Sequence, residues 1–290
     1  MVSASLPAED LYARALTATN AGRFPAARRL LDRAAAVAAD PDLRARIDLT
    51  AAYVESETAS PARGLELALD VLDRPGLGAE TYGRTWSQLG LLHMRMGRSE
   101  DALHAFAEAV DRLAEHPEPL ARVLLNRGNV FLQQGSPDRA AADFTEAAER
   151  FGQAGIAVEQ AKARFNVGYA ELLRGDLVAA LRGMDAARDV LAPLSPAYRA
   201  TVEQDRAEVL VAAGMSREAI RALDAAAAAY GTRRLRRFQA DCELALAQTL
   251  LRGDPARARV VARRAARRFR SQGSELPAPV SYTHLTLPTN

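Results

Sequence analysis

The sequence has one cysteine, one lysine and few aromatic residues, and each scarcity narrows what the protein can be. Cys242 alone cannot form a disulfide within the chain, which fits a reducing compartment. Only 6% of the 290 residues are aromatic although 49% are hydrophobic. Alanine therefore supplies much of the apolar content, which favours closely packed helices. No apolar run reaches the roughly 18 residues of a membrane-spanning helix, and the start lacks a signal-peptide pattern. We expect a cytoplasmic protein that does not contact membranes.

Catalytic and metal-binding motifs are also missing. We find no phosphate-binding G-x-x-x-x-G-K-[ST], no G-x-S-x-G and no H-E-x-x-H. The four histidines, at positions 93, 104, 116 and 284, are too scattered for a metal site. We interpret His93 as a packed side chain and Cys242 as a small buried thiol. The sequence therefore predicts no enzyme activity, no metal and no cofactor for this chain.

Internal repetition is the strongest pattern that the sequence does contain. Seven turn positions recur at spacings of 37 to 40 residues, and a small or apolar residue stands seven positions before each and a small one five positions after each. The turn positions are Gly22, Ala59, Gly97, Gly135, Gly175, Gly214 and Gly253. Three columns that stay in step through seven copies predict a repeat protein.

Each copy reads as two amphipathic helices separated by a tight turn, and WSQLGLLHMRMGRSEDALHAFAEAV is the clearest example. Its first helix places Trp86 and Gly90 on one face, and its second helix places Ala102 and Phe106 on the facing side. Gly90 and Ala102 are small where the two helices cross. We expect the larger rings of Trp86 and Phe106 to fill the space beside them.

Three turns end in a capping residue followed by proline. Ser60, Ser136 and Asp254 each precede a proline, which has no N–H to leave unpaired at the first helical position. Their side-chain oxygens are expected to accept a hydrogen bond from the first turn of the following helix.

The copy around Trp86 resembles the tetratricopeptide repeat (TPR), whose signature runs W-x2-L-G-x2-Y, then A-x3-F-x2-A. Here it reads Trp86-x2-Leu89-Gly90-x2-His93-x8-Ala102-x3-Phe106-x2-Ala109. The resemblance implies an all-α fold, a right-handed α-solenoid of about seven TPR-like helix-turn-helix repeats. We place this solenoid at residues 8–272, after a leader at 1–7 and before a linker at 273–279.

The resemblance also implies that the first helix of each pair lines a groove that binds a protein or peptide. The expected groove residues in copies three to five include amides, cations and a few aromatic side chains, a mixture that suits a peptide backbone and carboxylates. They are Arg84, Ser87, Arg122, Leu125, Asn126, Asn129, Gln133, Lys162, Phe165, Asn166 and Tyr169. The alternative is that Asn126 and Asn129 are ordinary consensus residues of the repeat.

Some TPR proteins clamp a C-terminal carboxylate with lysine, asparagine and arginine from three consecutive repeats. Asn129 and Asn166 match this pattern, but Leu125, Thr201 and Asp205 occupy the three cationic positions. Asp205 would repel the carboxylate, so we exclude a carboxylate clamp.

Basic residues concentrate near the end of the repeats. Residues 231–270 contain twelve arginines and three acids, although the whole chain has a net charge of only +2. In 255–270 we expect Ala258, Ala262, Ala265 and Phe269 to face inward, with a basic face formed by Arg257, Arg263, Arg264, Arg267 and Arg268. This face could dock an acidic downstream domain or simply be solvated. We disfavour nucleic acid because no groove-reading motif or aromatic platform accompanies it.

The last residues, VSYTHLTLPTN at 280–290, differ in composition from everything before them. We interpret them as the translation of a transposase-type sequencing adapter, and we expect the natural sequence to be truncated near Pro279.

The stretches AGRFPAARRLLDRAAA and FNVGYAELLRGDLVAALRGMDAAR resemble the repeat region that precedes caspase-like CHAT domains in actinobacterial proteins. This resemblance implies an interaction scaffold that is the recruiting or regulatory arm of a larger protein, with a possible intramolecular partner. A stand-alone TPR adaptor and the helical part of a transcriptional regulator remain alternatives.

Overall fold

The computed structural model describes residues 7–232 and 235–271, and each regular element within them is an α-helix. The helices are α1 Ala8–Asn20, α2 Phe24–Val37, α3 Pro41–Thr58, α4 Pro61–Leu72, α5 Ala79–Arg95, α6 Ser99–Arg112, α7 Pro117–Gln133, α8 Pro137–Gln153, α9 Ala157–Arg174, α10 Leu177–Leu191, α11 Pro196–Ala212, α12 Ser216–Thr232, α13 Arg236–Leu250 and α14 Pro255–Arg270. The prediction of an all-α fold is confirmed. The expected linker at 273–279 and the tail at 280–290 lie outside the described residues.

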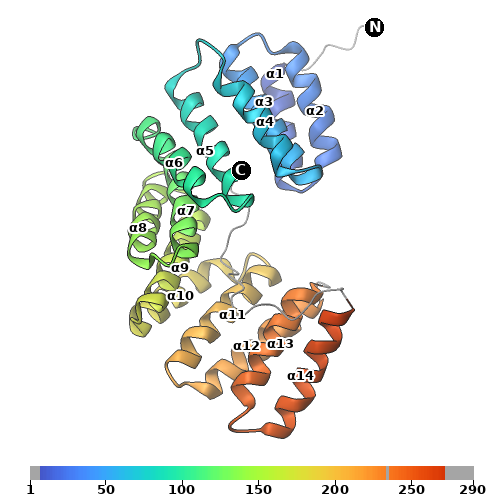
Figure 1. The fold of residues 1–290 in the computed structure, drawn as a ribbon, viewed down its shortest axis with the longest axis vertical. Helices are drawn as coiled ribbons and strands as arrows, with labels where there is room; N and C mark the ends of the chain where they lie inside the picture. Colours follow the sequence, from blue (N-terminus) through green and yellow to red (C-terminus); the bar gives the residue numbers. More distant parts are fainter. Residues whose placement is uncertain (1–6, 233–234, 272–290) are drawn as a thin grey trace. The chain divides into compact units, whose positions relative to one another are not determined.

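The helices form two compact units that meet in sequence between Gln134 and Gly135. In unit 1, which contains α1 to α7, the pairs α1/α2, α3/α4 and α5/α6 pack side by side, and α3 also contacts α1 and α5 (Figure 1). In unit 2, which contains α8 to α14, the pairs are α9/α10, α11/α12 and α13/α14, and α8 packs on α9. Consecutive helices thus pack as antiparallel neighbours in both units, as TPR-type pairs do.

Tight turns separate the two helices of a pair, and most of them depend on glycine. At five of the seven predicted turn positions a glycine has a positive φ, between 67° and 88°. They are Gly22, Gly97, Gly135, Gly175 and Gly214. A side chain would strain the backbone in this left-handed conformation, so glycine ends the first helix at low cost. The turns at Ala59 and Gly253 close without such a residue.

Small residues let the helices of a pair approach closely. A Cβ atom built on Gly90 in α5 would lie 2.5 Å from the Phe106 ring of α6. Similarly, a Cβ on Gly64 in α4 would lie 2.6 Å from the carbonyl oxygen of Ala52 in α3. The Phe106 ring, which lies beside Gly90, is fully buried. The expected pairing of a small residue with a ring is therefore confirmed for Gly90 and Phe106.

Two of the three predicted caps form. Ser60 Oγ accepts a hydrogen bond from the Arg63 N–H at 3.2 Å, and Asp254 Oδ1 accepts one from the Arg257 N–H at 2.9 Å. Ser136 makes no such bond, so its predicted cap is wrong. Backbone ψ does not account for this difference, because Ser136 has a ψ of 67° and Asp254 caps its helix at a ψ of 76°.

The two serines provide a matched pair for measuring the cap. We expect Ser60→Ala to lower the free energy of unfolding by about 1 kcal/mol, because one N–H of α4 loses its partner. We expect Ser136→Ala to change it by about 0.5 kcal/mol or less. Urea denaturation followed by far-UV circular dichroism measures both. Equal losses in the two variants would show that the bond at Ser60 is not the cause.

Candidate functional site

Unit 1 contains a groove with a volume of about 380 Å³. Its lining comes from the first helices of the pairs, α1, α3 and α5, together with α7 and the turn that precedes α7. The lining residues are Tyr12, Leu16, Arg46, Leu49, Thr50, Tyr53, Arg84, Ser87, Gln88, Leu91, Leu113, Glu118, Pro119, Arg122 and Asn126. We call this surface the unit 1 groove.

Three arginines form a ladder in the unit 1 groove. Arg46, Arg84 and Arg122 lie on α3, α5 and α7, and each stands 38 residues after the one before. Because 38 residues is also the distance between the turns at 59, 97 and 135, the three side chains occupy equivalent places in successive repeats. A periodic sequence has thus produced a row of guanidinium groups along one groove.

An acid stands one helical turn before each of these arginines, and two of the three acids form ion pairs. Arg84 pairs with Glu80 at 2.8 Å, and Arg122 pairs with Glu118 at 3.0 Å, in each case across one helical turn. Arg46 forms no such ion pair among the described residues, although its charge helps to lower the pKa of Asp42, and its guanidinium lies 5.9 Å from the centre of the Tyr12 ring. These side chains are partly exposed, so the pairs are solvated and weakly stabilising. A ligand that brings its own acids could take the place of these carboxylates.

Amide and hydroxyl groups occupy a second column of the groove. Thr50, Gln88 and Asn126 are again 38 residues apart. The Gln88 Nε2 atom is buried and has no hydrogen-bond partner among the described residues. Thr50 differs, since its hydroxyl lies 3.2 Å from the Tyr12 hydroxyl. A buried donor without a partner is costly in a folded protein, so Gln88 marks a place where a ligand acceptor would be stabilised.

The groove brings together Arg84, Arg122 and Asn126 as expected, with Ser87 beside them. Further along α7, Asn129 is only 3% exposed, and its Oδ1 atom has no partner among the described residues. Gln133 is exposed at the end of α7.

Leu125 is buried and Phe165, on α9 of unit 2, is fully buried, so interpreting them as groove residues is wrong. Their side chains belong to the apolar core, because burying apolar surface is favourable.

The expected residues of α9 lie in unit 2 and are buried. Lys162 pairs with Glu159 at 2.7 Å, and its ammonium group lies 5.5 Å from the centre of the Tyr198 ring. Asn166 is 2% exposed, and its Oδ1 atom has no partner among the described residues. The Tyr169 hydroxyl donates to a Glu208 carboxylate oxygen at 3.3 Å. These side chains present much less surface than the arginines of the unit 1 groove.

Sequence reasoning missed Arg46, Tyr12 and Tyr53 because copies one and two depart from the TPR signature. A signal for Arg46 was nevertheless present, since it stands one repeat before Arg84. Tyr53 packs beneath the Arg95 guanidinium, which lies 5.2 Å from its ring centre, and burial raises the pKa of the Tyr53 hydroxyl. Tyr53 is therefore neutral in the groove at physiological pH.

The basic face on α14 divides into paired and unpaired arginines. Arg257 pairs with Asp224, and Arg268 and Arg264 both approach Glu243, at 2.9 Å and 3.8 Å. Arg263 and Arg267 are exposed and have no acid partner among the described residues.

The predicted inner stripe of α14 needs one correction. Val261 is buried and Ala262 is exposed, so the stripe runs through Ala258, Val261, Ala265 and Phe269. The helix is rotated so that the larger Val261, which buries more apolar surface, faces the core.

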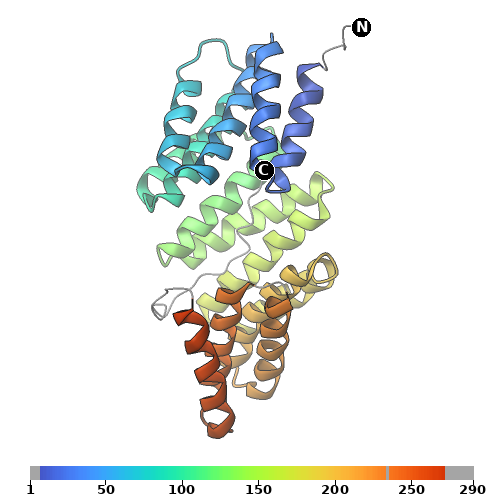
Figure 2. The same cartoon turned by 90° about the vertical axis from the view of Figure 1, so that its right-hand side faces the viewer.

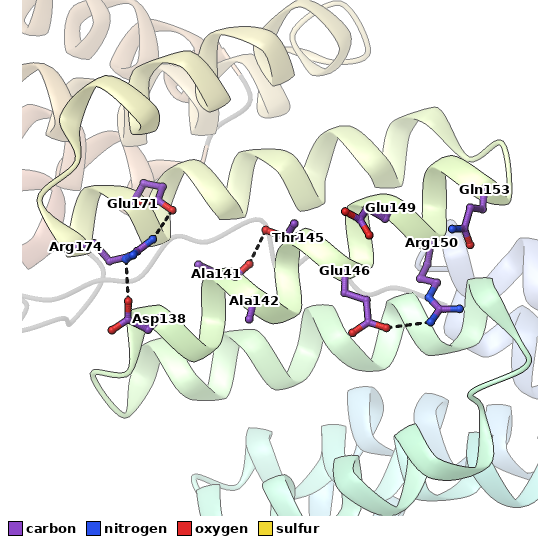
Figure 3. A pocket seen from close by; sticks show the side chains of 10 residues that line it. All are labelled: Asp138, Ala141, Ala142, Thr145, Glu146, Glu149, Arg150, Gln153, Glu171 and Arg174. Atoms are coloured by element: carbon purple, nitrogen blue, oxygen red, sulfur yellow. Dashed lines mark hydrogen bonds and ion pairs between the residues drawn. The ribbon is translucent and has the colours of Figure 1, made fainter.

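A larger hollow, of about 670 Å³, lies between α8 and α9 in unit 2 (Figure 3). Its charged groups largely satisfy one another. Arg174 bridges Glu171 and Asp138, each at 2.8 Å, and Arg150 pairs with Glu146 at 3.1 Å. The hollow is open, and its lining has four acids against two arginines that are both already paired, so it suits an acidic ligand less than the unit 1 groove does.

Cys242 and His93 are of types that often take part in catalysis or metal binding, but both are packed against other parts of the protein. Cys242 is fully buried, burial raises its pKa, and its thiol donates to Gln204 Oε1 at 3.2 Å. Burial also lowers the pKa of His93, which keeps its ring neutral near pH 7. The described residues contain no group of three or more side chains that could hold a metal ion. None of the described helices is long and apolar enough to cross a membrane.

Comparison with known proteins supports the repeat. The family model described as tetratricopeptide repeat matches residues 87–155 and 125–196, which confirms TPR repeats in that part of the chain. No curated protein matches the sequence.

Solved structures show the same type of fold at low sequence identity. The apo form of the quorum sensor NprR from B. thuringiensis aligns with a TM-score of 0.70 and 12% identity, over 90% of this chain and 76% of that chain. Aspartyl phosphate phosphatase F from Bacillus subtilis aligns with a TM-score of 0.65 and 13% identity, over 93% of this chain and 73% of that chain. A Rap protein complexed with competence and sporulation factor aligns with a TM-score of 0.63 and 16% identity, over 91% of this chain and 75% of that chain. At these identities the likeness shows the fold alone.

Proposed function

We propose that this chain is an interaction scaffold that binds an extended acidic peptide segment of a partner protein in the unit 1 groove. The observation that carries the proposal is the arginine ladder, which places Arg46, Arg84 and Arg122 along one groove. Guanidinium groups bind carboxylates by paired, charge-assisted hydrogen bonds, so a row of them favours a ligand with several acidic side chains.

The second column of the groove favours a peptide over a small anion. An extended peptide offers both N–H and C=O groups along its backbone, and each needs a partner when it is buried. Gln88 and Asn126 carry amides that can both donate and accept. The unpartnered Gln88 nitrogen is suited to a backbone carbonyl of the ligand. A Rap protein with this type of fold has been solved in complex with competence and sporulation factor, which is consistent with ligand binding by such repeats.

A selection from a library of random, unstructured peptides tests the proposal directly. We expect the full chain to enrich peptides that contain two or more aspartates or glutamates. The variant Arg46→Gln/Arg84→Gln/Arg122→Gln should lose this enrichment, because it removes the ladder.

The matched control is Arg29→Gln/Arg63→Gln/Arg98→Gln, which removes the same charge from exposed residues of unit 1 outside the groove. The control should select the same peptides as the natural chain. Selection of acidic peptides by the ladder variant, or their loss in the control, would refute the groove as the binding site.

A finer proposal is that the scaffold recruits substrates for, or regulates, a caspase-like CHAT domain of a larger protein. Its support is the sequence resemblance of residues 21–36 and 165–188 to the repeats that precede such domains. Reading the source DNA beyond codon 279 tests it. A reading frame that continues into a domain with a histidine and a cysteine would support it, and an immediate stop codon would remove it.

A further inference from the structure

Helix α14 carries seven arginines and no acid, and the structure separates them into two groups. Three of them are held by acids of neighbouring helices, since Arg257 pairs with Asp224 and both Arg264 and Arg268 approach Glu243. The other four have no acid partner among the described residues. They are Arg259, Arg263, Arg267 and Arg270.

The four unpaired arginines, which we call the α14 stripe, lie on one face of the helix. Their spacings of four, four and three residues place them one above another. At 1.5 Å per residue the stripe is about 17 Å long. Successive residues of an α-helix are rotated by about 100° around its axis, which places the stripe on the side of α14 opposite the buried Val261 and Ala265. The main neighbour of α14 is α13, and both views show α14, in red, at an edge of unit 2 (Figures 1 and 2).

A hollow of about 360 Å³ adjoins the stripe. Four arginines line it, and Arg267 belongs both to the hollow and to the stripe. The lining residues are Arg236, Arg264, Arg267, Arg268 and Ser271. Arg264 and Arg268 share the single carboxylate of Glu243, which is 3% exposed. The hollow therefore keeps an excess of positive charge that no described acid neutralises.

We propose that the hollow and the α14 stripe bind the phosphate backbone of duplex nucleic acid without reading its sequence. Guanidinium groups match phosphate oxygens in paired hydrogen bonds, and a linear row of them matches a polyanion of regularly spaced charge.

A protein partner fits this surface less well. The centre of a protein interface is normally apolar or aromatic, and Val260 is the only large apolar side chain that α14 exposes. Single-stranded nucleic acid is less suited as well, because the α14 stripe offers no ring on which a base could stack: the only aromatic side chain of α14, Phe269, is buried. The sequence analysis disfavoured nucleic acid because a groove-reading motif and an aromatic platform are missing, but binding to the phosphate backbone of a duplex requires neither.

The test is binding of a fluorescently labelled duplex DNA of about 20 base pairs to the full chain, measured by anisotropy at several salt concentrations. Four phosphate contacts predict a slope of log K against log salt near −3.6, which is roughly a 100-fold loss of affinity between 50 and 200 mM salt. A single strand of equal length should bind no more tightly than the duplex. Absence of binding, or tighter binding of the single strand, overturns the proposal.

Two matched variants locate the site. Arg263→Gln/Arg267→Gln should make the slope shallower by about 2, because two phosphate contacts are lost. Arg217→Gln/Arg221→Gln changes an exposed pair of arginines with the same spacing on α12 and should leave the slope unchanged. Circular dichroism melts of both variants confirm that they fold. An equal effect of the two variants contradicts the proposal. If poly-glutamate binds as tightly as the duplex, and Arg263→Gln/Arg267→Gln weakens that binding too, the proposal is overturned in favour of an acidic protein partner.

Discussion

Replacing Arg84 and Arg122 by glutamine should weaken the binding of an acidic peptide selected by the natural chain by about 10- to 100-fold. A hydrogen bond to a charged group can contribute about 1.5–3 kcal/mol, but these arginines are partly exposed and already have acid neighbours. About 1 kcal/mol for each arginine is therefore the expected loss. Titration of a labelled peptide gives the two dissociation constants. The variant should also bind with a weaker dependence on salt, because it has lost two charges.

The acid neighbours provide a control of opposite sign. The variant Glu80→Gln/Glu118→Gln should bind the same peptide more tightly, because Arg84 and Arg122 then lose their internal partners and keep their charge. A purely structural role of the ion pairs predicts instead that both double variants weaken binding equally. Equal weakening would therefore refute the ladder as a peptide-binding device.

Replacing Phe106 by alanine should lower the free energy of unfolding by about 3–5 kcal/mol. The ring is fully buried between α5 and α6, so its removal loses apolar burial and leaves a cavity. Such a loss is a large part of the stability of a typical domain, so we expect a marked fall in the melting temperature. Urea denaturation followed by circular dichroism measures it. Phe238→Ala is the control, because that ring is 38% exposed and stacks on Tyr230, and it should cost less, about 1–2 kcal/mol.

Gly90 gives the same contact a second, independent test. Gly90→Ala alone should cost about 1–3 kcal/mol, because its Cβ would lie 2.5 Å from the Phe106 ring. In the Phe106→Ala background the same change should be neutral or stabilising, because the ring is gone and alanine favours the helix over glycine. Additive effects in the two backgrounds would contradict close packing of these two residues.

Periodicity predicted the helix pairs because the spacing of small residues and turns depends only on local geometry. Gly90 and Phe106 lie in contact, as the pattern of this copy indicated. Two details depended on tertiary structure and were predicted wrongly. The Ser136 side chain accepts no hydrogen bond from the first turn of α8, and the rotation of α14 buries Val261 in place of Ala262. Sequence patterns place a residue on a helix, but packing decides the last tens of degrees of rotation.

The candidate site was predicted in part, because its residues follow the repeat. Arg84, Arg122 and Asn126 were expected from the consensus first helix, and all three line the unit 1 groove. Arg46 was not predicted, because its repeat lacks the TPR signature that is present in the repeats of Arg84 and Arg122. The unpartnered nitrogen of Gln88 could not be predicted, since it depends on which neighbouring atoms reach it. The same applies to the acid partners that divide the arginines of α14 into two groups.

The glutamates that pair with Arg84 and Arg122 have a consequence for selectivity. Each is tethered one helical turn from its arginine, so it competes with any ligand at a high effective concentration. A free monoanion such as acetate has no comparable advantage and should displace neither glutamate. A peptide with several acids gains the same advantage once its first carboxylate is bound, because the next becomes tethered as well. The groove should therefore ignore the abundant small anions of a cell and respond only to multivalent ligands.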